Sequence, residues 1–371
     1  MRAQAPGCRW SAEAPAEWAA LEAAAPLFAR RRWLEAMGSR IGDRHRWLVA
    51  SWGDEPLAGL YATVLDRPTH ALFDPARFLF GPGPLLPTPA VAGARASCFP
   101  CLLCMLPGYE CYPVGPDAGA GAPGGLDALV AGAVELAREE RMAAVACLFV
   151  GREPPAFGAA LAAAGFAPFP MAWRSDLVLP GAGMDDYLSS LGGHRRREVL
   201  RERRRLRDAG VTVRDVPLAA CAEDVVRLRG LHQRKYGHAY DEAGERRRLA
   251  LLAAAAGDEV SVLVAEVGGR VVALTLHVWD GEVWHAFLDG VEYGLPAARL
   301  AYFETSYYAF IEAAYALGRR RLSYGYGAEQ GKLHRGCRSE PVDGWALALD
   351  PAGHADVERA AARLRAWEAA R

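Results

Sequence analysis

Residues 261–327 read SVLVAEVGGRVVALTLHVWDGEVWHAFLDGVEYGLPAARLAYFETSYYAFIEAAYALGRRRLSYGYG, and this stretch decides the fold. It opens with three strand-like runs separated by Gly268-Gly269 and Asp280-Gly281, which are typical hairpin turns. The pattern predicts an antiparallel meander. A helix is expected over residues 297–318, and Gly318 ends it because glycine readily takes the left-handed conformation that closes helices. A further strand is expected over residues 320–327.

On either side of this stretch, strands continue to alternate with helices. The same reasoning predicts a helix over 184–209, a strand over 211–216, a helix over 222–236, a loop around 332–336, a strand over 344–350 and a helix over 354–370. In the first half it predicts helices over 26–37, 126–141 and 155–164, and strands over 46–52, 57–65, 142–150 and near 173–179.

The chain length indicates more than one hydrophobic core. Because 371 residues exceed the usual size of a single core, we expect two domains, 1–180 and 181–371. The order of elements predicts an α/β fold with mixed sheets (the α+β variant) in each domain. The first domain is expected to contribute to binding of the acceptor, and the second is expected to contain the residues that catalyse the reaction.

Composition points to a cytoplasmic enzyme. The net charge is −1, 52% of the residues are hydrophobic, and no apolar run reaches the roughly 18 residues that span a bilayer. The first residues lack the apolar core of a secretory signal. Four cysteines are spaced as in a metal site, but they lie in an apolar segment without a nearby histidine, so we expect core residues and no metal: Cys98, Cys101, Cys104 and Cys111.

The segment FETSYYAFIEAAYALGRRRLSYGYGAEQGKLHRGCRSEPV (303–342) resembles the C-terminal signature of FemAB-like proteins, which are GNAT-superfamily acyltransferases. In that family an aromatic-rich helix ending in Gly precedes a strand, a Gly-rich loop, a Lys and an Arg-Gly pair. The matching residues are Phe303, Glu304, Tyr307, Tyr308, Gly318, Gly327, Gln330, Gly331, Lys332, Arg335 and Gly336. The arginine-rich segment 190–211 resembles the helix that opens the family's second domain. The resemblance implies two tandem GNAT-like domains and transfer of an acyl group to an amine.

Three residues are candidates for catalysis. Lys332 lies in a Gly-rich loop and is expected to stabilise an oxyanion or a donor phosphate; the alternative is a solvated basic loop. His285 and Asp289 lie four residues apart on one predicted strand, hence on one face. His285 would take the proton of the amine, and Asp289 would orient the amine or help to remove its proton, although histidines on apolar strands are more often core residues.

The arginine content of residues 194–207 bears on the identity of the acyl donor. Residues 194–207 hold eight arginines and two glutamates, more positive charge than the phosphates of coenzyme A require. The helix at 298–317 also lacks the Arg/Gln-x-x-Gly-x-Gly/Ala loop that binds pyrophosphate in acyl-CoA enzymes. We therefore favour aminoacyl-tRNA as donor and tRNA as partner, with no bound cofactor. The residues expected to bind the donor are Arg195, Arg196, Arg203, Arg204, His334 and Arg335.

The acceptor is expected to be an amine of a small molecule or of a cell-wall precursor. Its pocket is expected to contain Glu304, Tyr307, Tyr308 and Tyr326. Glu304 lies on an apolar helix face, where a carboxylate is costly unless paired, so we expect it to pair structurally with Arg335 rather than to act as a base. Two alternatives remain open: an acyl-CoA-dependent N-acyltransferase and an inactive GNAT-like module that binds RNA.

Overall fold

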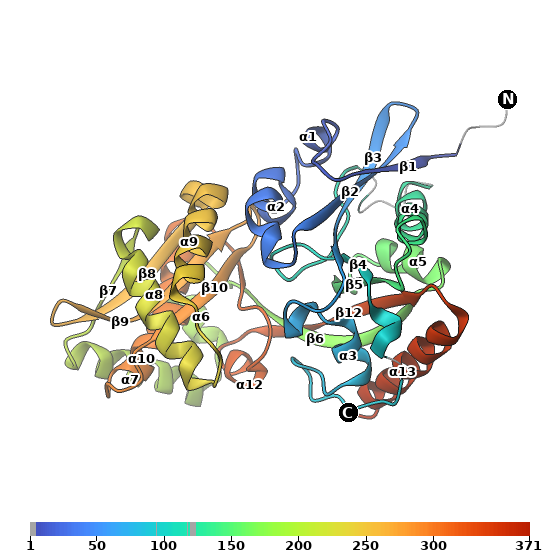
Figure 1. Ribbon diagram of the computed structural model, residues 1–371. Coiled ribbons are helices and arrows are strands. Elements are labelled where there is room, and N and C mark those ends of the chain that lie inside the picture. The colour runs from blue at the N-terminus through green and yellow to red at the C-terminus, as the bar shows by residue number, and fades with distance from the viewer. Residues whose placement is uncertain (1–4, 94, 117, 119–123) are drawn as a thin grey trace. The chain divides into compact units, whose positions relative to one another are not determined.

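Two strands connect the two halves of the molecule. The computed structural model describes residues 5–93, 95–116, 118 and 124–371 (Figure 1), and it separates into unit 1, Met1–Trp173 with Pro341–Arg371, and unit 2, Arg174–Glu340. Strands β6 (Ala167–Val178) and β12 (Arg338–Ala348) have residues in both units. The predicted ranges 1–180 and 181–371 therefore differ from these units, because the last strand pairs with β5 (Ala144–Gly151) of unit 1.

Unit 1 is built on a mixed sheet with the strand order β1-β2-β3-β4-β5-β12-β6. The remaining strands are β1 (Gly7–Ser11), β2 (Arg44–Trp52), β3 (Glu55–Leu65) and β4 (Cys101–Cys104). The predicted hairpin at Gly53 joins β2 to β3, and β4 pairs with β5 in parallel.

Helices and cysteines complete the core of unit 1. Its helices are α1 (Trp18–Leu21), α2 (Arg31–Met37), α3 (Pro75–Phe80), α4 (Gly125–Glu139), α5 (Ala156–Ala163) and α13 (Pro351–Ala369). Helices α4 and α5 bury their apolar faces against β2 to β5. The four clustered cysteines are buried, which confirms them as core residues: Cys98, Cys101, Cys104 and Cys111.

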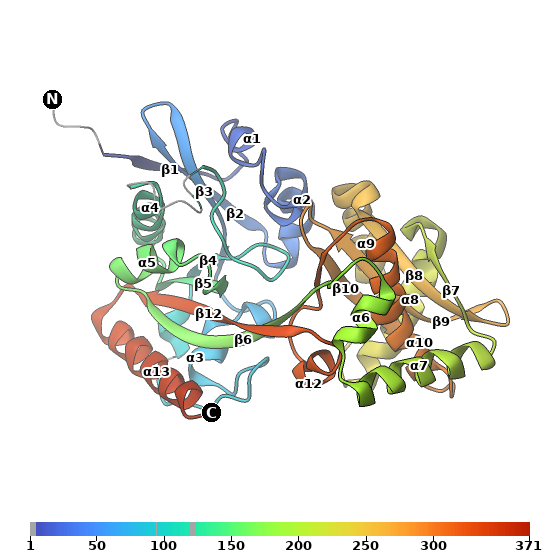
Figure 2. The same ribbon diagram turned by 180° about the vertical axis from the view of Figure 1, so that it is seen from behind.

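Unit 2 contains the predicted meander. Its strands follow the order β6-β11-β10-β9-β8-β7, and they are β7 (Thr212–Val216), β8 (Val260–Val267), β9 (Arg270–Trp279), β10 (Trp284–Val291) and β11 (Arg321–Ser323). Its helices include α6 (Met184–Ser190), α7 (Gly193–Asp208), α8 (Leu218–Lys235), α9 (Glu242–Ala256) and α12 (Glu329–Leu333). Helices α8 and α9 cover one face of the sheet, and α6 and α7 lie on the other (Figures 1 and 2).

In unit 2, two predicted helices are divided, one helix was missed, and Lys332, expected in a loop, lies in helix α12. The helix expected over 184–209 is divided into α6 and α7 at Leu191-Gly192, where the backbone becomes extended. The helix expected over 297–318 is formed, but as α10 (Ala298–Phe303), a π-helical turn η6 (Glu304–Tyr308) and α11 (Ala309–Ala316), with Gly318 at a φ of 68°. Helix α9 was not predicted.

No helix among the described residues is both long enough and apolar enough to cross a membrane.

Phe310 holds the core beneath the meander. Its ring is buried, with its centroid 3.8 Å from that of His277 and 4.6 Å from that of Trp284. We expect Phe310→Ala to lower the free energy of unfolding by about 3–5 kcal/mol, because a cavity remains where the ring was. Denaturant unfolding measures this loss. Leu317→Ala is the control, since Leu317 is 57% exposed and its truncation should cost less than about 0.5 kcal/mol. Equal losses would contradict the prediction.

Candidate functional site

The sheet of unit 2 opens where β11 ends. Strands β10 and β11 are parallel and pair only at Trp284 with Leu322 and at His285 with Ser323. Beyond this point a bulge between Ala286 and Leu288 bends β10 away. The two strands expected to flank a donor site therefore separate after one short stretch of pairing.

The chain beyond β11 turns sharply into α12. Gly325, Gly327 and Ala328 have φ values of 61°, 74° and 53°, so three of four successive residues are left-handed. This conformation directs two backbone carbonyls, those of Gly325 and Tyr326, toward the side chain of Lys332.

Lys332 is buried at this turn. Its side chain is in α12, the residue is 6% exposed, and Nζ donates to the carbonyl oxygens of Gly325 at 3.0 Å and Tyr326 at 3.1 Å. Burial lowers the pKa of Lys332 to about 8, an effect opposed by Cys337, Glu329, Asp289 and Asp176. The solvated basic loop considered from sequence does not describe this buried side chain.

Asp289 lies on β10 beyond the bulge, within the electrostatic reach of Lys332. Its Oδ1 accepts hydrogen bonds from Thr275 Oγ1 and Ser306 Oγ, both at 2.9 Å, and Thr275 Oγ1 lies 2.8 Å from Ser306 Oγ. No hydrogen bond from the described residues reaches the other oxygen of Asp289, Oδ2, and the residue is partly exposed. Burial raises the pKa of Asp289, while the two hydroxyls, Arg229 and Lys332 oppose the rise.

His285 and Asp289 have different hydrogen-bond partners and do not share one face of β10. Its Nε2 lies 2.8 Å from Asp280 Oδ2 at the hairpin, whereas Asp289 bonds to Thr275 and Ser306. The bulge inserts one residue between them, so the alternation of side chains shifts and the expected shared face is lost. This corrects the prediction from the four-residue spacing.

Glu304 is paired, but with a different arginine from the one expected. Its carboxylate accepts from Nη2 and Nε of Arg203 at 2.8 and 3.0 Å, and Arg203 also bonds to Glu312. Glu304 and Arg203 line a hollow of about 400 Å³ beside α7. The structural role predicted for Glu304 is supported, with Arg203 in the place of Arg335.

Arg335 is enclosed by aromatic rings. Its guanidinium carbon lies 3.9 Å from the ring centroid of Phe303 and 4.8 Å from that of Tyr307, and Nη1 donates to the carbonyl of Gly331. The residue is 4% exposed. It therefore supports the α10–α11 region from within, rather than offering its donors to a ligand at the surface.

The three predicted pocket tyrosines are also held by internal contacts. Tyr307 stacks on Tyr324 with ring centroids 4.5 Å apart, and Tyr308 donates to Glu202 Oε2 at 2.8 Å. Tyr326 is partly exposed and uses its carbonyl to hold Lys332. Of these, only Tyr326 adjoins the opening.

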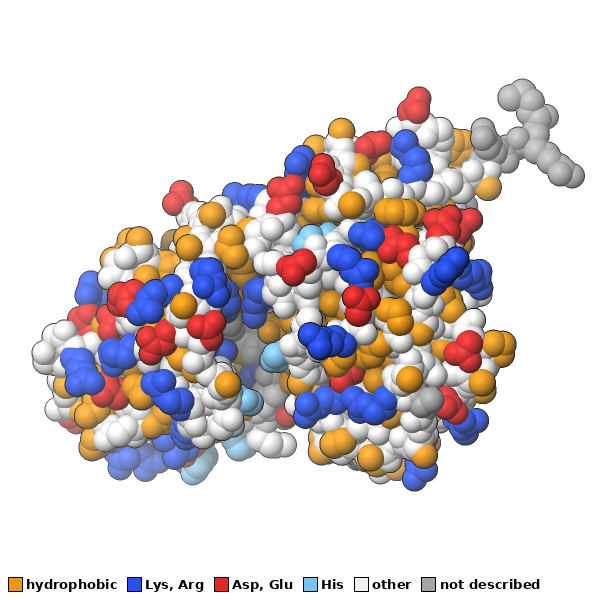
Figure 3. All heavy atoms as spheres, viewed as in Figure 1, with side chains coloured by type: hydrophobic (Ala, Val, Ile, Leu, Met, Phe, Trp, Pro, Cys, Tyr) orange, Lys and Arg blue, Asp and Glu red, His pale blue; other side chains and the backbone are white. Residues whose placement is uncertain are grey.

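The arginines of α7 fall into two groups. Arg195 donates to the carbonyl of His334 and to Glu198, and Arg203 is paired as described. Six others are exposed: Arg196, Arg197, Arg201, Arg204, Arg205 and Arg207. Figure 3 shows basic side chains along the lower edge of unit 2, where α7 runs. His334 is exposed as well.

Sequence reasoning missed the hydroxyl groups around Asp289. Thr275 comes from β9, while Ser306 lies in the π-helical turn, and no short motif links them to Asp289. The nearest signal was a run of polar residues, Glu304-Thr305-Ser306, within an apolar helix. A π-helical turn is often found at functional sites, because it redirects side chains from the usual spacing.

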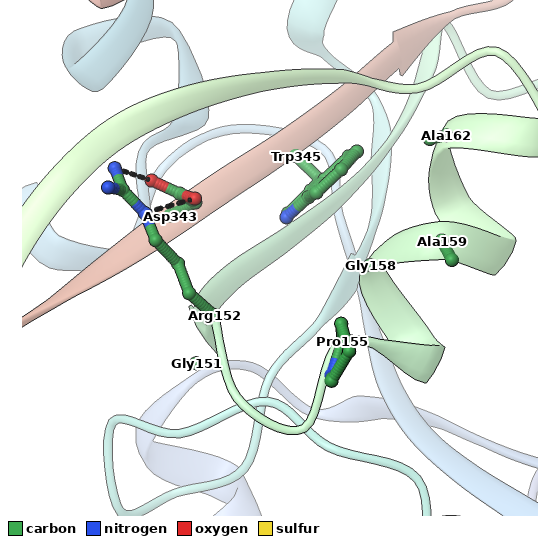
Figure 4. A pocket seen from close by; sticks show the side chains of 8 residues that line it. All are labelled: Gly151, Arg152, Pro155, Gly158, Ala159, Ala162, Asp343 and Trp345. Carbon is green, nitrogen blue, oxygen red and sulfur yellow. Dashed lines mark hydrogen bonds and ion pairs between the residues drawn. The ribbon is translucent and has the colours of Figure 1, made fainter. Parts of the chain in front are cut away.

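Unit 1 has a separate hollow of about 310 Å³ (Figure 4). Trp345 lines it, and Arg152 at its edge is bonded to Asp343 and Glu368. The guanidinium of Arg152 is thus already paired with two carboxylates of the protein. None of the residues predicted to act in catalysis or binding lines this hollow.

A family profile matches most of the chain. The FemAB-like family profile, described as peptidoglycan biosynthesis/recognition, matches residues 92–367. No match was found among curated protein sequences.

Solved structures show the same fold at low identity. FemX is 10% identical, with 86% of this chain and 91% of that chain covered and a TM-score of 0.58. A tandem GNAT protein from the clavulanic acid biosynthesis pathway is 12% identical, with 93% and 99% covered and a TM-score of 0.50. L-PGS from Bacillus licheniformis is 11% identical, with 82% and 86% covered and a TM-score of 0.50. The fold is that of two tandem GNAT-like domains.

The Arg203 ion pairs provide a test with an internal control. We expect Glu304→Ala to lower the free energy of unfolding by about 3 kcal/mol, because Glu304 is buried and its loss leaves a desolvated guanidinium with one partner. Glu312→Ala removes the other partner, whose side chain is 45% exposed, and should cost less than about 1 kcal/mol. Urea unfolding compares the two. A larger loss for Glu312→Ala would contradict the assignment.

Proposed function

The chain belongs to the FemAB-like family of GNAT-type acyltransferases, and we propose that it transfers an aminoacyl group from aminoacyl-tRNA to an amine of a small molecule or cell-wall precursor. The observation that carries the proposal is the opening between β10 and β11. A buried lysine and a partly exposed carboxylate, Lys332 and Asp289, adjoin it and interact electrostatically.

The two side chains suit the two needs of amide formation. The amine must lose a proton, and Asp289 Oδ2 is the carboxylate oxygen that the neighbouring hydroxyls leave available. The tetrahedral intermediate carries an oxyanion, and the Lys332 ammonium has one N–H beyond those bonded to Gly325 and Tyr326. His285, held by Asp280, takes no part in this scheme.

The reaction balances with these groups alone. The amine nitrogen attacks the ester carbonyl carbon of the aminoacyl-tRNA, and Asp289 accepts the proton that the nitrogen loses. Lys332 stabilises the oxyanion until the ester C–O bond breaks. The protonated Asp289 then gives this proton to the departing ribose oxygen, which leaves as a hydroxyl, and an amide bond remains.

The exposed arginines of α7 support an RNA donor. Six exposed guanidinium groups on one helix form the electrostatic footprint expected for a sugar–phosphate backbone. One of the similar structures, the tandem GNAT protein, supports the acyl-CoA alternative. An inactive RNA-binding module would keep the arginine surface but would not need Lys332.

The donor is tested by supplying charged total tRNA and, separately, acyl-CoA. We expect product by mass spectrometry only with charged tRNA, and its formation should be abolished by ribonuclease. Product with acyl-CoA alone would overturn the tRNA assignment while leaving acyl transfer intact. RNA binding without product from either donor, unchanged in Lys332→Met, would support the inactive module.

The arginine surface is tested in the same assay. The double variant Arg196→Glu/Arg204→Glu should weaken tRNA binding by at least tenfold and reduce its salt dependence, because phosphate contacts release counterions. The double variant Arg67→Glu/Arg138→Glu is the charge-matched control, since both are exposed arginines of unit 1. An equal effect of both changes would mean that only net charge matters.

The rate should depend on pH through Lys332 and Asp289. Lys332 acts when protonated, so kcat should fall above pH 8, near its lowered pKa of about 8. Asp289 acts when ionised, and because its pKa is raised, the acidic limb should lie above that of an ordinary carboxyl group. Lys332→Met should lower kcat by about 100-fold or more, as expected when an oxyanion donor is lost.

Lys332→Arg is the control for this profile. A guanidinium stays protonated across the accessible range, so the alkaline limb should disappear even if the rate is lower. Thermal unfolding of each variant checks that the fold is intact. An unchanged alkaline limb in Lys332→Arg would assign the titration to another group.

A further inference from the structure

The C-terminal end of α8 carries exposed aromatic rings among cations. We call His232, Lys235, Tyr236 and Tyr293 the aromatic–basic cluster. Tyr236 is 58% exposed and Tyr293 is 36% exposed, values that are high for large rings. Lys235 is also exposed, and it is one of only two lysines in the chain.

The contacts within the cluster hold its rings together. Tyr293 and His232 are joined by a hydrogen bond of 2.9 Å between the phenol oxygen and Nδ1. The ring centroid of His232 lies 5.1 Å from that of Tyr236 and 5.9 Å from that of Tyr293. Lys235 Nζ lies 3.4 Å from the ring centroid of Tyr293 and 5.6 Å from that of Tyr236. The most exposed ring, Tyr236, is therefore backed by an imidazole and flanked by an ammonium.

The electrostatic environment of the cluster is positive. The pKa of His232 is lowered to about 4, first by burial and then by the charges of Arg229, Lys235 and His238. At neutral pH the imidazole is consequently an uncharged ring in contact with two tyrosines. The positive charge is carried by residues at its margin, where an anionic group would meet it.

The cluster adjoins the proposed reaction centre. Tyr293 follows Asp289 by four residues, which span at most about 14 Å even when fully extended. Burial raises the pKa of Tyr293, and Tyr236 and the charge of Asp289 raise it further, so Tyr293 lies within the electrostatic reach of Asp289. A ligand held by the cluster would thus have its reacting end within reach of Asp289.

We propose that the aromatic–basic cluster binds the unpaired 3′-terminal nucleotides of the donor RNA, an inference that rests on the proposed function. A base would stack on Tyr236, and an adjoining phosphate would meet Lys235. Stacking on exposed aromatic rings beside basic groups is how proteins hold single-stranded RNA. Helix α7 contains no Phe, Tyr or Trp, so its arginines suit the paired backbone instead.

The test uses the full chain and a four-nucleotide single-stranded RNA that ends in adenosine and carries a 5′ fluorophore. We expect Tyr236→Ala to weaken its binding about tenfold in fluorescence anisotropy, as for the loss of one stacked base. Tyr236→Phe, which keeps the ring, should bind as the unmodified protein does. Trp52→Ala is the matched control, because Trp52 is a 46% exposed ring of unit 1.

Kinetics distinguish this site from the catalytic groups. Tyr236→Ala should raise KM for aminoacyl-tRNA with kcat nearly unchanged, whereas Lys332→Met lowers kcat. If transfer from tRNA occurs but Tyr236→Ala changes neither oligonucleotide binding nor KM, the cluster is not the RNA site and the proposed function still stands. If acyl-CoA displaces the oligonucleotide and supports transfer while charged tRNA does not, both proposals fail. If Trp52→Ala weakens oligonucleotide binding as much as Tyr236→Ala does, the assignment of the cluster as the RNA site is also overturned.

Discussion

The hydrogen bonds from Lys332 to the carbonyls of Gly325 and Tyr326 are the interaction on which the site depends. They hold the left-handed turn after β11, so the chain leaves the sheet, and among the described residues no strand pairs with that edge of β10 beyond His285. A longer β11 would fill the opening with a paired strand. The ammonium thus shapes the opening and also supplies its positive charge, at the cost of the solvation that lowers its pKa.

Asp289 complements this arrangement from the other side of the opening. Two hydroxyls converge on one of its oxygens, which limits rotation of the carboxylate and leaves the second oxygen to the ligand. The π-helical turn makes this convergence possible, because an extra residue in the helix brings Ser306 over the sheet. On the other side of the same turn, the ion pair of Glu304 with Arg203 attaches it to α7. The turn therefore links the proposed catalytic carboxylate to the proposed RNA surface.

The sequence was informative wherever local chemistry decided the structure. The meander followed from strand patterns and glycine turns, and the helix end followed from Gly318. Contacts between distant residues escaped it: Arg203 and Glu304 are 101 positions apart, and several arginines were equally plausible partners. The bulge in β10 has no marker, since Ala286 to Leu288 suit a regular strand equally well. Helix α9 was missed because its apolar residues are mostly small alanines.

The two strands shared by the units have a consequence for how the protein is built. Unit 2 enters after Trp173 and returns at Pro341, and Ser175 Oγ and Ser339 Oγ lie 3.1 Å apart just inside these points. Unit 2 is therefore an inserted domain whose two ends meet, while both ends of the described chain belong to unit 1. Folding of unit 1 therefore brings the two ends of unit 2 together, because β6 and β12 are neighbours in the sheet.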